Sequence, residues 1–213
     1  MSAGKEAAKV MRREQIIDAA EKLFFTKGFE RSTMDDVAGT AHFSKRTVYA
    51  YFSSKEQLNF EVMIRGYRLL IAMLKKEEQK WAEGHIDSRL EQMAIALYTF
   101  SKEYPGYFSA IFSYENAEAD FQEDIPDQSL KECYALGEEV FGMLTRLIRE
   151  GQAGGLYRKE LDPVKAALVL WSCMDGIFNT SKVKAGYIQS MHHTSPDSVV
   201  AYALQMLIRC IKK

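Results

Sequence analysis

The feature that most constrains this sequence is a close succession of helix-start signals near its N-terminus. Thr33 and Ser44 are side chains favoured at helix N-caps, and Ser53 or Ser54 supplies the next one. Asp36 stands three residues after Thr33, where it can complete a capping box. Because each start follows so soon after the last, only helices of about two turns fit between them. The spacing predicts two short helices, over residues 34–41 and 45–52, followed by a long one.

A longer amphipathic helix is predicted ahead of the two short ones, over residues 12–27. Its apolar residues recur at the spacing of one helical face, and Gly28 directly after it suits a helix C-terminus. On the second short helix, Val48 and Phe52 lie four residues apart and are expected to face the same core. The predicted small core consists of Ile16, Ala20, Phe24, Val37, Ala41, Val48 and Phe52.

Two short capped helices joined by a turn of three or four residues form a helix-turn-helix, which places its second helix in the DNA major groove. An alternative is a small helical subdomain whose surface happens to carry Lys and Arg, because capping signals alone leave both interpretations open. The face of the second helix that points away from the core carries side chains able to donate hydrogen bonds to DNA. They are Lys45, Arg46, Thr47, Tyr49 and Tyr51.

The run from Ile16 to Leu58 resembles the N-terminal signature of the TetR family of transcriptional regulators. This run is 43 of the 213 residues, about a fifth of the chain. The resemblance implies an all-α protein that binds double-stranded DNA. The matching residues include Ala19, Ala20, Leu23, Phe24, Gly28, Thr33, Ala38, Ser44, Thr47, Val48, Tyr49, Tyr51, Phe52, Ser54, Lys55 and Glu56.

The resemblance also assigns roles to single residues. Residues 45–47 would begin the recognition helix, and Tyr49 and Tyr51 would touch phosphates. Lys55 would hold the DNA backbone from the next helix, and the Thr33 hydroxyl, at a helix N-terminus, can meet a phosphate. The expected DNA-binding residues are Thr33, Ser44, Lys45, Arg46, Thr47, Tyr49, Tyr51 and Lys55.

Two residues depart from the family pattern. The turn carries His42 where the family usually has Gly, and His tolerates the left-handed backbone better than most residues, so we expect the turn to be kept. Arg46 stands where a small Gly is common. Its guanidinium can read a guanine edge or hold a phosphate, and both roles stay open.

The first residues of the chain are basic, with Lys5, Lys9, Arg12 and Arg13. Arms of this kind follow the DNA backbone or enter the minor groove in other DNA-binding domains. A disordered tail is the expected state without DNA.

Beyond residue 80 the sequence predicts further helices and no strands. Pro163 and Pro196 each follow a capping residue, which is a helix-start signal. The expected helices span residues 88–104, 106–115, 127–152, 162–182 and 196–212. The chain is thus predicted to be all-α with about nine helices: a three-helix helix-turn-helix DNA-binding domain at residues 10–56 and a helical effector-binding and dimerisation domain at residues 57–213.

The last two helices are apolar over wide faces, which a single subunit would partly expose. Ala166, Leu170, Cys173 and Ile177 mark one face, and Val199, Ala203, Met206, Leu207 and Cys210 mark the other. The resemblance implies that these helices pair with their copies in a homodimer with twofold symmetry. Such a dimer requires a palindromic operator.

The resemblance places a pocket for a small-molecule effector among the middle helices, where Met and aromatic residues are frequent. Most of these residues are expected to be ordinary core, and the identity of the effector is not given by the sequence. Asp175 is either a solvated or interface charge or a partner for a cationic effector. The candidates are Met93, Leu97, Phe100, Tyr104, Phe108, Phe112, Tyr134, Phe141, Trp171, Met174, Asp175 and Phe178.

Other classes of protein find little support in the sequence. The apolar runs fall short of the ~18 residues of a membrane helix, and no secretory signal is recognised, so we expect a cytoplasmic protein. Catalytic and phosphate-loop motifs are missing, and neither the three cysteines nor His192 and His193 have the spacing of a metal site. We therefore expect no enzyme, no metal and no cofactor. A transcriptional activator, or an interaction module that has lost DNA binding, remain the alternatives to a repressor.

Overall fold

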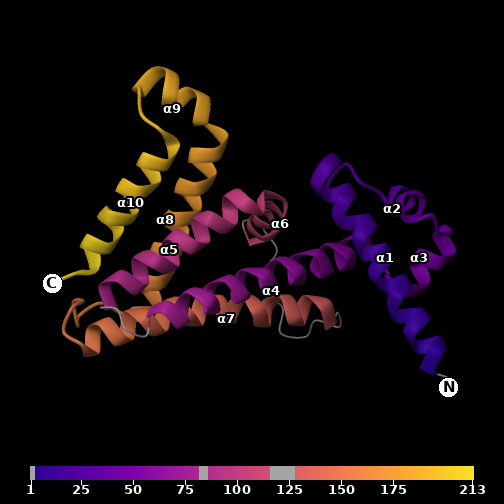
Figure 1. The fold of residues 1–213 in the computed structure, drawn as a ribbon, viewed down its shortest axis with the longest axis horizontal. Helices are drawn as coiled ribbons and strands as arrows, with labels where there is room; N and C mark the ends of the chain where they lie inside the picture. The colour runs from indigo at the N-terminus through magenta and orange to yellow at the C-terminus, as the bar shows by residue number, and fades with distance from the viewer. Residues whose placement is uncertain (1–2, 82–85, 116–127) are drawn as a thin grey trace. The chain divides into compact units, whose positions relative to one another are not determined.

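The computed structural model describes residues 3–81, 86–115 and 128–213, and its ten helices within these ranges are shown in Figure 1. The all-α prediction is confirmed, whereas the predicted count of about nine misses one helix of the described ranges, α9. The start predicted at Asp127 lies outside the described residues. The helices are α1 (Ala3–Lys27), α2 (Met34–Ala41), α3 (Lys45–Tyr51), α4 (Lys55–Trp81), α5 (Ile86–Glu103), α6 (Pro105–Glu115), α7 (Gln128–Ala153), α8 (Pro163–Val183), α9 (Ala185–His192) and α10 (Pro196–Ile211).

The chain forms two compact units, the first of which consists of residues 1–68 and 105–136. It holds α1, α2 and α3, the beginning of α4, α6 and the beginning of α7. Its helix-turn-helix core contains the predicted apolar residues, with Ala41 half-buried at the margin. The fully or almost fully buried members are Ile16, Ile17, Ala20, Val37, Val48, Phe52, Leu58 and Val62.

The N-terminal segment differs from its prediction. Residues expected to be disordered continue α1 back to Ala3, so that α1 is one helix of 25 residues. The segment AGKEAAKVM is rich in Ala, Lys and Glu, which are strong helix formers. Its side chains from Gly4 to Arg12 are exposed, so propensity and not packing explains this extension.

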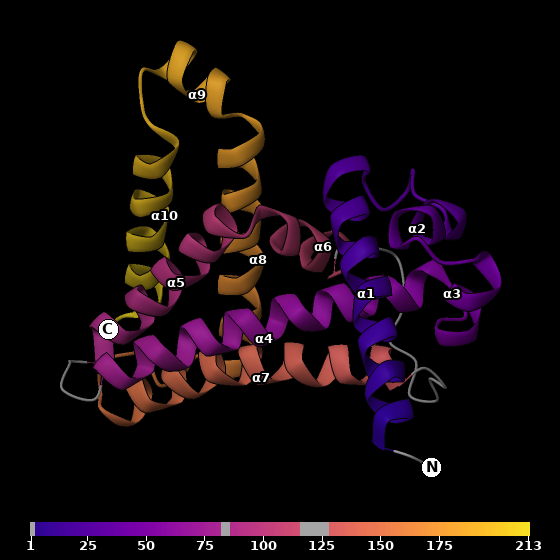
Figure 2. The same ribbon diagram turned by 45° about the vertical axis from the view of Figure 1, so that its right-hand side comes forward.

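The second unit consists of residues 69–104 and 137–213. In it, α10 packs on both α8 and α5, and α9 connects α8 to α10 (Figure 2). The core side chains come from one face of each of these helices. They include Met93, Leu97, Phe100, Leu170, Met174, Phe178, Val200, Leu204 and Ile208.

The outward faces of α8 and α10 carry exposed apolar side chains. They include Val164, Leu168 and Val169 on α8, and Tyr202 and Met206 on α10. Part of the prediction for α8 was wrong, because Leu170 is buried in the unit itself. Leu168 and Leu170 are two residues apart, and two residues correspond to about 200° around a helix with 3.6 residues per turn, so the exposed Leu168 lies on the other side of α8 from the buried Leu170.

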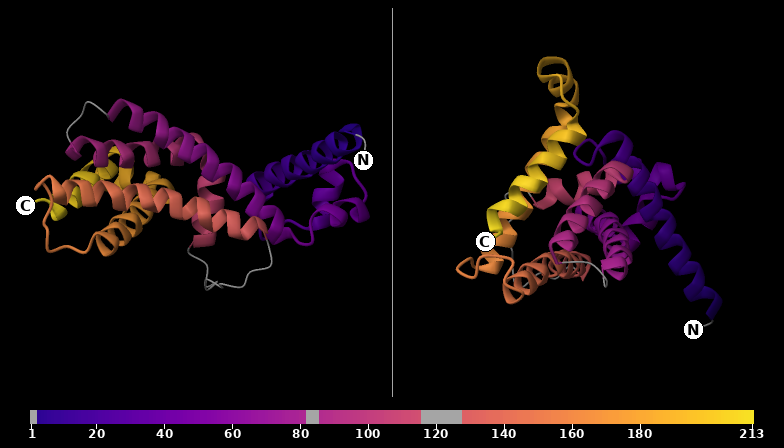
Figure 3. Two further views of the ribbon diagram at one scale, coloured as in Figure 1. Left: turned by 90° about the horizontal axis from the view of Figure 1, so that it is seen from below. Right: turned by 60° about the vertical axis from the view of Figure 1, so that its left-hand side comes forward.

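The end of α7 is held against the C-terminus of the chain. Tyr157 is fully buried and lies against Gly151, and an isolated antiparallel bridge joins Tyr157 to Lys212. The backbone N–H of Arg158 donates to the carbonyl of Ile211 at 3.0 Å. Helix α4, by contrast, is continuous over 27 residues (Figure 3). Among the described helices, none combines the length and the apolar character that a membrane-spanning segment needs.

Candidate nucleic-acid interface

The turn between α2 and α3 depends on one residue in the left-handed conformation. His42 has φ 58° and ψ 33°, and its N–H donates to the carbonyls at the end of α2. The next N–H, that of Phe43, donates to Ala38 at 3.0 Å. The expected turn is therefore kept with His in place of the usual Gly. It sets the direction in which α3 leaves α2.

Ser44 begins α3 as its N-cap. Its side-chain oxygen accepts from the N–H of Thr47 at 3.1 Å, and the two hydroxyls lie 2.8 Å apart. Val48 and Phe52 are buried, so one face of α3 is fixed on the core. The hydroxyls of Ser44 and Thr47 are thereby held at the start of the helix, where backbone N–H groups also point outward.

The opposite face of α3 presents its long polar side chains to solvent. Arg46 is exposed and its guanidinium has no hydrogen-bond or ion-pair partner among the described residues. Tyr49 is 45% exposed. Lys45 is exposed too, but its Nζ lies 2.8 Å from the carboxylate of Asp35, and this hydrogen bond raises the pKa of Lys45. The structure therefore brings Lys45, Arg46 and Tyr49 to one exposed surface.

Two other candidates are more deeply placed than the sequence suggested. Tyr51 is half-buried and packs against the helix-turn-helix core. Lys55 is half-buried as well, and its Nζ donates to the carbonyl of Phe29 at 3.0 Å and lies 4.1 Å from the centre of the Phe29 ring. Their predicted phosphate contacts stay predictions.

The N-terminus of α2 is closed by the predicted capping box. Thr33 accepts from the N–H of Asp36 at 3.1 Å, and the Asp36 carboxylate accepts from the N–H of Thr33 at 2.9 Å. Lys27 donates to the same carboxylate at 2.6 Å. The hydrogen bond from Lys27, together with those from Thr33, lowers the pKa of Asp36 to about 2. The Thr33 side chain is exposed beside this cap.

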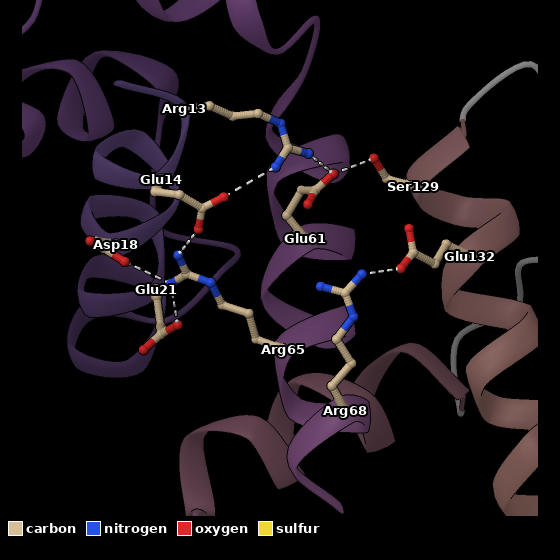
Figure 4. A network of polar contacts seen from close by, with 9 residues as sticks. All are labelled: Arg13, Glu14, Asp18, Glu21, Glu61, Arg65, Arg68, Ser129 and Glu132. Carbon is tan, nitrogen blue, oxygen red and sulfur yellow. Dashed lines mark hydrogen bonds and ion pairs between the residues drawn. The ribbon is translucent and has the colours of Figure 1, made fainter. Parts of the chain in front are cut away.

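A network of charges joins α1 to α4 and was not predicted from the sequence (Figure 4). Arg65 on α4 lies 2.7 Å from Glu14, 2.8 Å from Asp18 and 2.9 Å from Glu21, all on α1. Burial disfavours the charged form of Arg65, but the three carboxylates outweigh it and raise its pKa. Tyr107 on α6 donates to Glu21 at 2.8 Å. The sequence gives one indication of this network, which is that the three acidic residues share one face of α1.

A second contact reaches from α1 to α4 and α7. Arg13 forms an ion pair with Glu61, whose side chain is 11% exposed, and Ser129 donates to the same carboxylate at 2.6 Å (Figure 4). Arg68 on α4 pairs with Glu132 on α7. The orientation of the helix-turn-helix on the first part of α4 is thus fixed by charges as well as by apolar packing.

The candidate effector residues are divided between the two units. Phe108, Phe112 and Tyr134 belong to the first unit, and the other nine belong to the second. Within the second unit, Met93 and Met174 line a cavity of ≈ 10 Å³ between α5, α7, α8 and α10. That volume is about the room for one water molecule. Asp175 is half-buried on α8.

The candidate interface lies in a segment that matches a known family of proteins. Residues 16–62, which include every candidate DNA-binding residue, match the model of the bacterial regulatory proteins of the tetR family. The chain is similar to the HTH-type transcriptional repressor NicS of Pseudomonas putida, with 27% identity over 162 residues, 75% of this chain and 72% of that protein. An uncharacterized HTH-type transcriptional regulator of Bacillus subtilis, YfiR, is 35% identical over 92 residues, 42% of this chain and 44% of its own.

A solved structure supports the fold over almost the whole chain. It is that of a bacterial regulatory protein in the tetR family from Rhodococcus RHA1, with a TM-score of 0.68 and 18% identity. The match covers 94% of this chain and 97% of that one.

Proposed function

Since this chain is a transcriptional regulator of the TetR family, we propose that it is a homodimeric repressor that binds a palindromic operator and leaves it when a small-molecule effector binds. It would act in the cytoplasm, where its operator is. The proposal rests on one observation above all. Helix α3 carries Arg46, which has no partner in the described part of the chain, next to Lys45 and Tyr49, on the face opposite the buried Val48.

The proposed dimer fits the role of α3 as the recognition helix. The exposed apolar side chains of α8 and α10 provide a surface that a second copy would cover, and an isologous contact would relate the two copies by a twofold axis. Two recognition helices related in this way read half-sites about one DNA turn apart, ~34 Å, or a multiple of it.

The proposed release step needs an effector that prefers the arrangement unable to bind DNA. We expect α4 to be the lever, since it is one unbroken helix and Arg65 ties it to α1. The effector would bind among the candidate Met and aromatic residues. An effector with equal affinity for the free and the operator-bound protein would contradict this coupling.

Two alternatives to a repressor remain as candidates. One relative, FasR of Mycolicibacterium smegmatis, is a transcriptional activator, and it is 32% identical over 73 residues. Activation therefore stands as the second candidate, and transcription from the isolated operator with and without the protein distinguishes the two. An interaction module that has lost DNA binding is the third.

Selection of bound sequences from a random DNA pool tests the proposal. Wild-type protein would be compared at one stated salt concentration with Arg46→Ala and with Lys76→Ala, which removes one exposed positive charge from α4 outside the first unit. We expect wild type and Lys76→Ala to enrich one palindromic motif and Arg46→Ala to enrich it weakly or not at all. Equal, unenriched pools from all three proteins would favour the interaction module.

A further inference from the structure

A groove separate from the predicted effector residues lies at the junction of α8, α9 and α10. Figure 2 shows these three helices at the top of the view. We call it the tip groove. Its volume is ≈ 540 Å³, which falls within the range of roughly 300–1,000 Å³ found for small-molecule sites. The cavity between α5, α7, α8 and α10, at ≈ 10 Å³, has no such room. The tip groove is lined by Thr180, Lys184, Tyr187, Ile188, His192, Thr194 and Val199.

The charge of the tip groove has one sign. None of its lining residues is acidic, and residues 176–196 contain no Asp or Glu at all, although the whole chain has a net charge of −1. Lys184 stands at the junction of α8 and α9, and its ammonium group has no hydrogen-bond or ion-pair partner among the described residues. An unpaired cation on a groove wall attracts an anion.

Four of the other lining residues of the tip groove are apolar or aromatic. Ile188 is buried and Val199 half-buried, so both present carbon surface at fixed positions. The ring of Tyr187 meets that of His192 edge-on, with 5.2 Å between their centres. Tyr187 is nevertheless 56% exposed. An aromatic or aliphatic body next to an anionic group would cover this surface.

We propose that the tip groove binds a small organic carboxylate with an apolar body. The carboxylate accepts a charge-assisted hydrogen bond from Lys184, and the hydroxyls of Thr180 and Thr194 lie on the same groove. The apolar body lies against Ile188 and Val199. A carboxylate fits better than a polyanion because the groove offers one unpaired ammonium group and mostly carbon surface.

Calorimetric titration of the full-length protein with 2-naphthoate tests the proposal. We expect saturable binding, about tenfold weaker in Lys184→Gln, because a hydrogen bond to a charged group is lost. The matched control is Lys182→Gln, which removes a positive charge two residues earlier, outside the groove lining, and should bind within about twofold of wild type. Thr180→Trp should abolish binding by filling the groove while it keeps Lys184.

The cationic analogue 2-naphthylmethylammonium separates charge recognition from simple apolar binding, and we expect no saturable binding of it. Equal affinity for both compounds, equal affinity of wild type and Lys184→Gln for 2-naphthoate, or no binding of 2-naphthoate at about 1 mM would each overturn the proposal. Operator binding of the same variants is measured in parallel. Lys184 is far in sequence from the helix-turn-helix, so the two proposals can fail separately. If the wild-type protein bound 2-naphthoate but bound no operator, the repressor proposal would be overturned and the tip-groove proposal would stand.

Discussion

Arg46 has all of its donors available to DNA, since it is exposed and unpaired among the described residues. We expect Arg46→Ala to weaken binding to the selected operator by ~1–3 kcal/mol and to abolish discrimination at one base pair of each half-site, as loss of a bidentate contact to guanine does. Titrations with operators altered at single positions measure this. A uniform loss over all sequences, with the salt slope lower by about one, would instead identify a phosphate contact.

Asp36 makes the stability of the α2 cap depend on pH. Its pKa is about 2 in the folded protein and near 3.8 when the chain is unfolded, so the stability that its ionised form contributes is complete above about pH 4. That contribution is lost as the pH falls from about 4 to about 2. We expect the Tm of wild type to fall more steeply in this window than that of Asp36→Asn, which has no carboxylate to protonate. Parallel thermal unfolding curves for the two proteins would contradict this assignment.

At single residues, the sequence could predict which side chains are buried but not all of their partners. Pattern and capping signals indicated correctly that Val48 and Phe52 face the core and that Lys45 and Arg46 face solvent. They could not reveal that Lys45 pairs with Asp35, because that pair depends on the angle between α2 and α3. Nor could they show that Lys55 donates to the carbonyl of Phe29, a partner on a distant turn.

At the element scale, two glycines of α7 give a matched pair of substitutions. A Cβ at Gly151 would lie 2.2 Å from the ring of the buried Tyr157, whereas a Cβ at Gly142 meets no heavy atom within 4 Å. We expect Gly151→Ala to destabilise the protein by ~1–3 kcal/mol through overpacking, and Gly142→Ala to stabilise it by up to ~1 kcal/mol through helix propensity. Chemical denaturation of both variants measures the difference. Similar effects of the two substitutions would mean that Tyr157 does not sit against α7 in solution.

The helix boundaries were predictable where a residue type alone stops or starts a helix. Asp162 before Pro163 and Ser195 before Pro196 are N-caps as expected, with side chains that accept from backbone N–H groups. Helix α9 was missed because Lys184 alone separates it from α8, and Lys184 carries no side-chain cap. A break of one residue with an ordinary side chain leaves no compositional signal.

At the scale of the whole molecule, the sequence predicted which helices are apolar on wide faces. It did not predict which row of apolar side chains is buried within a unit and which row is exposed. Leu170 and Leu168 are both apolar, yet Leu170 is buried in the second unit and Leu168 is 52% exposed. The difference follows from how α8 packs on α5 and α10, which depends on contacts between segments far apart in the chain. Periodicity defines a face, but the neighbours decide its orientation.

The exposed row leads to a prediction about assembly. A stable homodimer buries roughly 800 Å² on each partner, and we expect the outward faces of α8 and α10 to provide it. Leu168→Glu combined with Met206→Glu would place four carboxylates in the twofold interface and should give a monomer by light scattering. The helical circular dichroism should be unchanged, because both side chains are exposed in the single chain.

The same pair of substitutions connects assembly to DNA binding. Because a monomer engages one half-site at a time, we expect the double variant to bind the full palindrome at least about 100-fold more weakly than wild type, with little change on an isolated half-site. Ile95→Glu is the control, since Ile95 is 49% exposed on α5 and outside the proposed interface. A double variant that stays dimeric would assign the interface to other helices. A monomer that binds the palindrome as tightly as wild type would show that dimerisation does not set operator affinity.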